Sequence, residues 1–227
     1  MFVVKVFAGD AYSGCRFVRL YNQDPQELTL ISTLPFKFGK ICAINVAMDD
    51  ILENYRHLVA RVDALCHGIE KALREHITCS EGCSTCCTSI TLFPVETAAL
   101  NIALDVMPAE EADNIRSYVS EHADDERCPL LHHQRCLLYA ARPIICRTHG
   151  LPILYTENDQ QRVDCCPLNM EQCESLPGSV VIDLDRLNSV LVAVNALFLS
   201  QTDNPAELPE RLSIAEALTG GVFVSNR

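Results

Sequence analysis

Four cysteines within nine residues carry the clearest chemistry in this sequence. The segment CSEGCSTCC contains Cys79, Cys83, Cys86 and Cys87. Spacings of two and three residues let consecutive thiolates converge on one ion, and Gly82 lets the backbone turn back toward it. A buried core position accounts for one thiol but not for four so close together. The cluster therefore predicts metal ligation. Because adjacent side chains tend to point apart, we expect one member of the Cys86-Cys87 pair to serve a second site or to bridge two metals.

Further cysteine motifs follow along the chain: CPLL at 128–131, CLLYAARPIICR at 136–147 and CCPL at 165–168. Together with the first cluster, these motifs resemble the YkgJ-type cysteine cluster family, whose members are described as zinc- or iron-chelating. The resemblance covers roughly residues 79–166 and implies a cofactor class, zinc or iron, more firmly than an activity. It implies eight ligands: Cys79, Cys83, Cys86, Cys87, Cys128, Cys136, Cys146 and one of the pair Cys165 and Cys166.

The number of thiols agrees with that implication on chemical grounds. Eight thiolates make two tetrahedral four-cysteine sites, each with a formal excess of two negative charges around a divalent ion, or ligate an iron-sulfur cluster and a second metal. Arg142 and Arg147 flank Cys146. They either donate charge-assisted hydrogen bonds to the sulfurs or form ordinary salt bridges in an acidic protein.

Other residues with metal-binding chemistry are weaker candidates. The eight thiolates are enough to complete the metal sites without the histidines near these motifs. Cys173 is at most a spare ligand. Three more cysteines lack partners at ligand spacing, and the one at position 66 falls on a predicted helix, which favours core packing. The residues of this weaker group are His132, His133, His149, Cys173, Cys15, Cys42 and Cys66.

Three classes of function remain compatible with the sequence. The leading one is a metal-binding protein that chelates zinc or iron through the cysteine cluster, because closed four-sulfur sites are typically structural. An iron-sulfur redox protein or oxidoreductase is the alternative. The third class is a thiol-disulfide enzyme using Cys83 and Cys86, but the sequence around them lacks the strand-helix setting expected of such a site. Related cysteine clusters also occur in protein lysine methylases, but this sequence contains no glycine-rich nucleotide loop. The sequence names no catalytic residue.

Composition narrows the partners of the chain. It has 227 residues, 48% of them hydrophobic, with a net charge of -12 and a pI near 4.9. Such a charge speaks against a nucleic-acid partner. No apolar run reaches the ~18 residues of a membrane helix, and the first residues do not form a convincing signal peptide. We therefore expect a cytoplasmic protein whose partner is a metal ion, because dense thiols in a reducing compartment are most often made useful by ligating metal.

Residues 48–227 are expected to form a mostly α domain with irregular cysteine-rich metal-binding loops. The first helix starts near Met48, with apolar residues at three- and four-residue steps, and dimerisation through this helix is an alternative to packing within the domain. Further helices are expected at 94–106, 109–123, 183–199 and 211–218. The apolar positions of the first helix are Ile51, Tyr55, Leu58, Val62, Leu65, Ile69 and Leu73.

Residues 1–47 differ from the rest of the chain. They carry five Lys and Arg against three Asp and Glu, a charge of +2, whereas the remainder carries 13 against 27, a charge of -14. Strand-like pieces occur at 2–7, 15–21 and 27–32. The segment is expected to be a small β-containing appendage or a translated stretch upstream of a true start at Met48.

Overall fold

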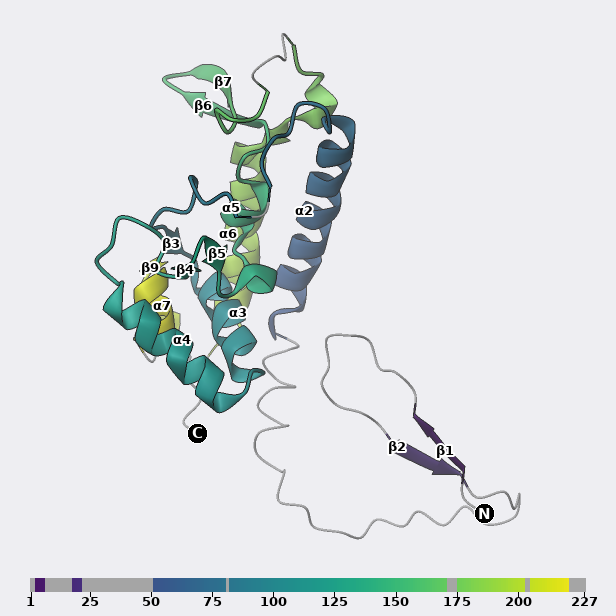
Figure 1. The fold of residues 1–227 in the computed structure, drawn as a ribbon, viewed down its shortest axis with the longest axis vertical. Coiled ribbons are helices and arrows are strands. Elements are labelled where there is room, and N and C mark those ends of the chain that lie inside the picture. Colours follow the sequence, from purple (N-terminus) through teal and green to yellow (C-terminus); the bar gives the residue numbers. More distant parts are fainter. Residues whose placement is uncertain are drawn as a thin grey trace. The chain divides into compact units, whose positions relative to one another are not determined.

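The computed structural model describes residues 3–6, 18–21, 51–80, 82–170, 175–202 and 205–220. Its contacts divide the chain into two units, residues 1–44 and 45–227, which are described separately. In the first unit, β1 (Val3–Val6) pairs antiparallel with β2 (Val18–Tyr21) (Figure 1). The strand expected at 27–32, the helix start at Met48, and Cys15, Cys42 and Cys173 lie outside the described residues. The role of residues 1–47 therefore stays a prediction.

The second unit is a mixed α/β structure, about half helical, in which small sheets accompany the helices. The expected mostly α fold is therefore only partly right. The missed strands are two to five residues long, too short for the alternation of apolar and polar residues that identifies a strand in sequence. The helices of the described residues are α2 (Glu53–Ala72), α3 (Pro94–Asp105), α4 (Ala109–Glu121), α5 (Ile144–Thr148), α6 (Leu184–Leu199) and α7 (Ile214–Thr219).

The strands of this unit form three small sheets. β3 (Thr91–Leu92) pairs antiparallel with β9 (Leu212–Ser213), and β4 (Leu131–His132) pairs antiparallel with β5 (Arg135–Cys136). β6 (Ile153–Glu157) lies between β7 (Gln160–Asp164), with which it forms an antiparallel hairpin, and the parallel β8 (Ile182–Asp183). Short 3₁₀ helices span Tyr139–Ala141, Gly178–Val180 and Pro205–Glu207.

The long amphipathic helix exists as α2, which ends at Ala72, directly before the last expected apolar position, Leu73. Its buried side is formed by Tyr55, Leu58, Val62, Cys66 and Ile69. The expected core position at Leu65 is wrong: its side chain is 44% exposed. A four-residue step from Val62 reaches Cys66, so the thiol occupies the core position and the neighbouring leucine faces solvent. Dimerisation through this helix stays a prediction.

The described helices have recognisable start signals. Pro94 stands at the first position of α3, where its missing N–H costs nothing. Asp183 caps α6 by accepting a hydrogen bond from the Arg186 backbone N–H at 2.9 Å, and Ser213 forms a capping box with Glu216 in α7. Within the described residues, no helix is long and apolar enough to cross a membrane.

Two hydrophobic clusters form the core, and α3 contributes to both. Val95 and Ala98 pack in a first cluster with residues of α2, α5 and α6. Leu100 and Leu104, further along the same helix, pack in a second cluster with residues of α4 and α7. Figure 1 shows the corresponding arrangement, with α2 beside α6 and with α4 beside α7. The cysteine-bearing segments lie between these elements.

Candidate metal centre

The two halves of the cysteine motif lie side by side. The Cys128 backbone N–H donates to the Cys87 carbonyl at 3.2 Å, and Thr88 forms an antiparallel bridge with Arg127. The Arg127 guanidinium also donates to the Ser84 carbonyl at 2.6 Å and to its hydroxyl at 2.9 Å. Backbone pairing and a charged side chain thus join the CSEGCSTCC loop to the segment that follows α4.

A tight hairpin brings Cys136 back toward Cys128. In this hairpin, Leu131 of β4 pairs with Cys136 of β5. The turn residues His133 and Gln134 have φ values of 46° and 63°, left-handed conformations that a two-residue hairpin turn requires. Both Cys128 and Cys136 pack against the second hydrophobic cluster. The hairpin therefore fixes two thiols on the core.

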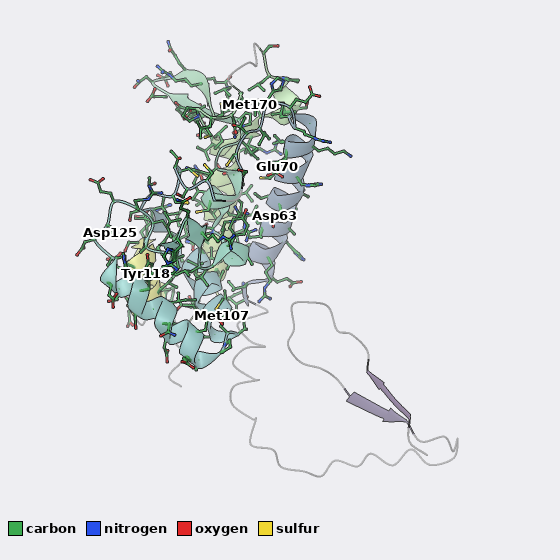
Figure 2. All side chains as sticks on the ribbon, in the orientation of Figure 1. Asp63, Glu70, Met107, Tyr118, Asp125 and Met170 are labelled. Atoms are coloured by element: carbon green, nitrogen blue, oxygen red, sulfur yellow. The ribbon has the colours of Figure 1, made fainter. Side chains whose placement is uncertain are left out.

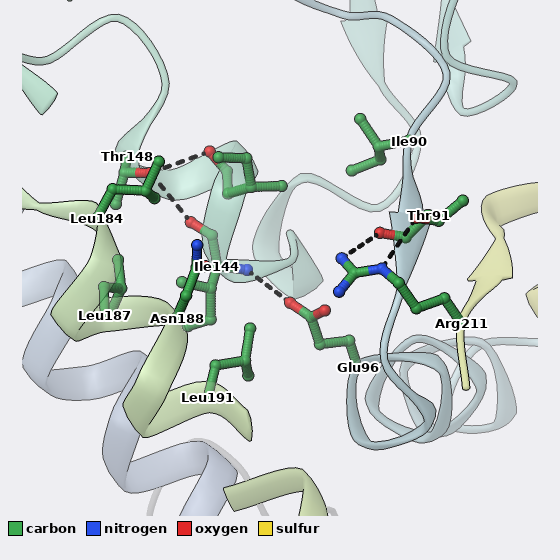
Figure 3. A pocket seen from close by; sticks show the side chains of 11 residues that line it. Ile90, Thr91, Glu96, Ile144, Thr148, Leu184, Leu187, Asn188, Leu191 and Arg211 are labelled. Atoms are coloured by element: carbon green, nitrogen blue, oxygen red, sulfur yellow. Dashed lines mark hydrogen bonds between the residues drawn. The ribbon is translucent and has the colours of Figure 1, made fainter. Parts of the chain in front are cut away.

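Helix α5 carries Cys146, and a buried carboxyl group on α3 holds the start of this helix. Glu96 is only 3% exposed. It accepts hydrogen bonds from the backbone N–H groups of Phe93 at 3.2 Å and Ile144 at 3.1 Å; the second bond is drawn in Figure 3. Each bond satisfies an N–H at a helix start, where helical partners are missing. Burial raises the pKa of Glu96, and the two backbone hydrogen bonds oppose that rise.

A cleft of about 330 Å³ lies beside this helix, lined by Glu96, Ile144, Thr148 and residues of α6 (Figure 3). Arg211 lines it from the other side, donating to the Thr91 carbonyl at 3.1 Å and hydroxyl at 3.0 Å. Ile144 and Thr148 are one helical turn apart, so they lie on one face of α5, and Cys146, two residues on from Ile144, lies on the opposite face. The short helix thus separates the cleft from the cysteines.

The two arginines beside Cys146 support the surrounding backbone. Arg147 donates to both carboxylate oxygens of Asp63 on α2 at 2.8 and 2.9 Å, and to the carbonyls of Arg142 and Ala140 at 2.7 and 2.8 Å. Asp63 is labelled on α2 in Figure 2. Of the two expectations for Arg147, the salt bridge is the contact observed.

Arg142 likewise contacts carbonyls, donating to Tyr139 at 3.1 Å and to Cys146 at 3.5 Å. Its guanidinium lies 3.7 Å from the centre of the Tyr139 ring, a cation–π contact. These contacts of Arg142, with the backbone and an aromatic ring, match neither of the two alternatives expected from the sequence, a bond to sulfur or a salt bridge. Its positive charge still reaches the site, since it lowers the pKa of the Cys136 thiol against the larger rise due to burial.

A single asparagine joins the remaining cysteine segments. Asn169 is 3% exposed. Its side-chain oxygen accepts from the backbone N–H groups of Thr78 at 3.0 Å and Cys79 at 3.1 Å, and its side-chain nitrogen donates to the Gly150 carbonyl at 2.8 Å. Its own backbone N–H donates to the Cys166 carbonyl at 2.8 Å. Asn169 thus joins three segments of the chain: the start of the first cluster at Thr78 and Cys79, the turn after α5 at Gly150, and the CCPL motif at Cys166.

Gly150 allows this meeting because of its backbone. It has a φ of +89°, and a side chain there would approach the Asn169 amide nitrogen at 3.4 Å and the Cys166 Cβ at 3.7 Å. Only glycine adopts this conformation without strain. The chain leaving α5 therefore turns directly against the Cys166 segment.

We describe the eight motif cysteines as two groups of four, because the thiol charges that raise the pKa values of Cys79, Cys128 and Cys146 come from within the same group. The first group, here the inner cysteines, comprises Cys87, Cys128, Cys136 and Cys146. Burial is the largest cause that raises the pKa of Cys146 to about 12 and of Cys128 to about 11, and the charges of other inner cysteines add to both rises. After burial, Cys136 is the largest cause that raises the pKa of Cys87.

The second group, here the outer cysteines, comprises Cys79, Cys83, Cys86 and Cys166. Burial raises the pKa of Cys79 to about 11, and interactions with each of the other three outer cysteines add to this. The pKa of Cys86 is raised by burial, by Cys87 and by Cys83 and Cys166. Hydrogen bonds from Thr85 lower the pKa of Cys83 instead. The two groups meet at the adjacent pair Cys86-Cys87, where an interaction with Cys86 lowers the pKa of Cys87.

Three further candidates from the sequence analysis contact other parts of the domain. Cys165 packs against the first hydrophobic cluster, and Cys66 is 6% exposed in the same core, the position expected for it. His132 and His133 form an aromatic cluster with Tyr118: the ring centroids of Tyr118 and His132 are 4.9 Å apart, and those of the two histidines 4.0 Å. No disulfide joins the cysteines of the described residues.

The donor set fits zinc or iron by its chemistry. Soft thiolate sulfur is the ligand type that both metals accept, in groups of four. As the side chains stand, no three His, Cys, Asp or Glu residues of the described ranges are arranged to hold an ion. Mutual repulsion between thiolates is among the causes that raise the pKa values of Cys79 and Cys146. A cation would offset that repulsion and displace the thiol protons on binding.

Residues 78–167 match the model of a family named CxxCxxCC, described as "Putative zinc- or iron-chelating domain". The matched segment contains the CSEGCSTCC, CPLL and CLLYAARPIICR motifs. The match confirms the resemblance drawn from the cysteine motifs and supports metal binding in general. Searches of curated proteins and of solved structures found no match.

Sequence reasoning missed two residues that position the CxxCxxCC cysteines. Asn169 lies three residues after Cys166. Glu96 lies two residues after Pro94, where an acidic residue indicates only the start of a helix. A weak signal existed for Asn169, because short polar side chains near a ligand often bind backbone N–H groups. The long-range partners of both residues become visible only in the fold.

Proposed function

We propose that this chain is a metal-binding protein that chelates two ions, zinc or iron, one in the inner and one in the outer cysteines. The observation that carries the proposal is that backbone contacts bring together motif cysteines spread over 88 positions of sequence: the Cys128 N–H donates to the Cys87 carbonyl, and Asn169 joins Cys79 to Cys166. When bound, each ion would cross-link segments that are distant in sequence.

The contacts of the CCPL motif favour one of its two cysteines as the metal ligand. Cys166 interacts with Cys79 and Cys86, and its carbonyl is held by Asn169. Cys165 packs on the hydrophobic core. We therefore assign the ligand role to Cys166, and place the protein in a reducing compartment such as the cytoplasm, where these thiols stay available.

The test is metal analysis with an absorption spectrum on full-length protein purified without oxygen. The expected result is about two equivalents of metal, and Co²⁺ substitution should give the charge-transfer absorption of thiolate ligands. A brown protein with visible absorption and inorganic sulfide would establish the iron-sulfur alternative. Absence of both signals in reduced protein would refute the proposal.

Matched variants locate the ligands. Cys166→Ser should lower the bound metal by about one equivalent, whereas Cys165→Ser, one residue away, should retain both. Cys83→Ser and Cys146→Ser should each lose metal and stability together. Cys66→Ser should keep full metal content and cost only about 1–3 kcal/mol for burying a hydroxyl. Loss of metal in the Cys66 variant, with full content in the Cys83 and Cys146 variants, would place the site elsewhere.

A further inference from the structure

We propose that the cleft beside α5 binds a free α-amino acid with an aliphatic side chain. The cleft has a volume of about 330 Å³, and small-molecule sites in proteins typically occupy about 300–1,000 Å³. It lies on the face of α5 opposite Cys146, so binding there is independent of the proposed metal chelation. The basis of the proposal is the placement of charged and apolar side chains within the cleft.

Glu96 gives the cleft a buried carboxyl group without a cationic partner. It is 3% exposed, and each of its oxygens accepts one backbone N–H, from Phe93 or Ile144. A carboxylate oxygen can accept two hydrogen bonds, and no side chain of the described ranges forms a salt bridge with Glu96. Buried charges in proteins are normally paired. A ligand in the cleft (Figure 3) that carries an ammonium group therefore supplies the missing partner.

Arg211 adds a positive charge near this carboxyl group. Its guanidinium donates to the Thr91 hydroxyl and carbonyl and lies 4.1 Å from the centre of the Phe93 ring. Its charge is among the causes that lower the pKa of Glu96 against the larger rise due to burial, so the two charged groups lie close to each other. A guanidinium has five N–H donors. Those that do not contact Thr91 suit the two oxygens of a ligand carboxylate.

Helix α6 gives the cleft an apolar wall. Leu184, Leu187 and Leu191 follow one another at three- and four-residue steps, so they lie on one face of the helix, and all three line the cleft. Figure 3 shows these leucines at the left of the cleft and Arg211 at its right, with Glu96 between them. Glu96 and Arg211 are the charged residues among those of the described chain that line the cleft. The cleft thus has one charged end and one apolar side.

An α-amino acid matches this arrangement in all three respects. Its ammonium and carboxylate stand on neighbouring carbon atoms, and its side chain extends away from both. The ammonium pairs with Glu96, the carboxylate with Arg211, and an aliphatic side chain leaves water against the leucines of α6. A fatty acid lacks the cation that Glu96 needs, and an alkylamine places its cation near Arg211 without the anion that would offset the repulsion.

The experiment is a titration of full-length protein, purified without oxygen, with L-leucine, followed by the amide NMR signals. Three analogues each lack one recognised group: isocaproate lacks the ammonium, isoamylamine the carboxylate, and free glycine the aliphatic side chain. Leucine should shift the amide signal of Ile144, whose N–H bonds to Glu96. Each analogue should bind at least about tenfold more weakly. No binding of leucine at about 10 mM, or equal binding of leucine and any analogue, would overturn the proposal.

Variants separate the two charged groups. Arg211→Gln should weaken leucine binding at least about tenfold without weakening the binding of isoamylamine, which has no carboxylate. The matched control Arg186→Gln, an exposed arginine of α6 outside the cleft, should bind leucine as the wild type does. Glu96→Gln should weaken the binding of leucine and isoamylamine alike. Unchanged leucine affinity in the Arg211 variant would contradict the proposal, and the analogue series on the wild type decides the role of Glu96 if its variant does not fold.

Discussion

Removal of the Asn169 side chain should loosen the outer cysteines and destabilise the domain. Asn169→Ala removes the three shortest hydrogen bonds of the side chain, those from the Thr78 and Cys79 N–H groups and the one to the Gly150 carbonyl, together with a longer one of 3.5 Å from the Thr78 hydroxyl. At about 1 kcal/mol of net stability each, the free energy of unfolding should fall by about 3 kcal/mol. The residue is 3% exposed, so water replaces these bonds poorly.

The assay is urea unfolding of reduced, metal-free protein, compared with Asn169→Asp as the matched variant. Aspartate keeps the oxygen that accepts from Thr78 and Cys79 but loses the donor to Gly150, so about 1–2 kcal/mol should be lost. In the metal-loaded protein, Asn169→Ala should weaken the outer site by about 10–100-fold and leave the inner site unchanged. A change in unfolding free energy below about 0.5 kcal/mol, or equal weakening of both sites, would refute the positioning role of Asn169.

Two further predictions concern Glu96 and Arg147. Burial raises the pKa of Glu96 above its value in the unfolded chain, so the folded state binds the carboxyl proton more tightly. The contribution of Glu96 to the free energy of unfolding therefore falls as pH rises from about 4.3 through the folded pKa. Glu96→Gln should remove that decline. The measurement is the free energy of unfolding in urea, determined for the metal-free variant and the metal-free wild type between about pH 4 and 7. If this free energy depends on pH in the same way in both proteins, the prediction is wrong. Arg147→Lys loses the bonds to the Arg142 and Ala140 carbonyls and should cost about 2 kcal/mol. Asp63→Asn removes only the ion pair with Arg147, in which Asp63 is half-exposed, and keeps the two bonds from Arg147 to the carbonyls. It should lower the free energy of unfolding by less than about 1 kcal/mol. An equal loss in the two variants would contradict the expectation that the carbonyl bonds contribute more than the ion pair.

The features predicted well from the sequence are those set by local periodicity and spacing. Helix α3 was expected at 94–106 and spans Pro94–Asp105, and α6 was expected at 183–199 and spans Leu184–Leu199. Their apolar patterns and caps lie within the helices themselves. The family of the cysteine segment was likewise recognisable, because its signal is the spacing of one residue type.

What could not be predicted depends on residues distant in sequence. Leu65 and Cys66 both fit a helical apolar pattern, and only packing decides which one is buried. Strands such as β4 and β5 have two residues each, so their pairing depends on the turn between them. The partner of Arg147 is Asp63, 84 positions earlier, and neither spacing nor composition indicates that contact.

The double role of α3 has a consequence for how the domain unfolds. Eight of its twelve residues are buried, some in the first hydrophobic cluster and some in the second. Neither cluster can open without exposing part of this helix, so the two clusters lose their packing in one cooperative step. The amide protons of α3 should accordingly exchange with solvent only through global opening, and the hydrogen-exchange free energy measured there equals the stability of the whole domain.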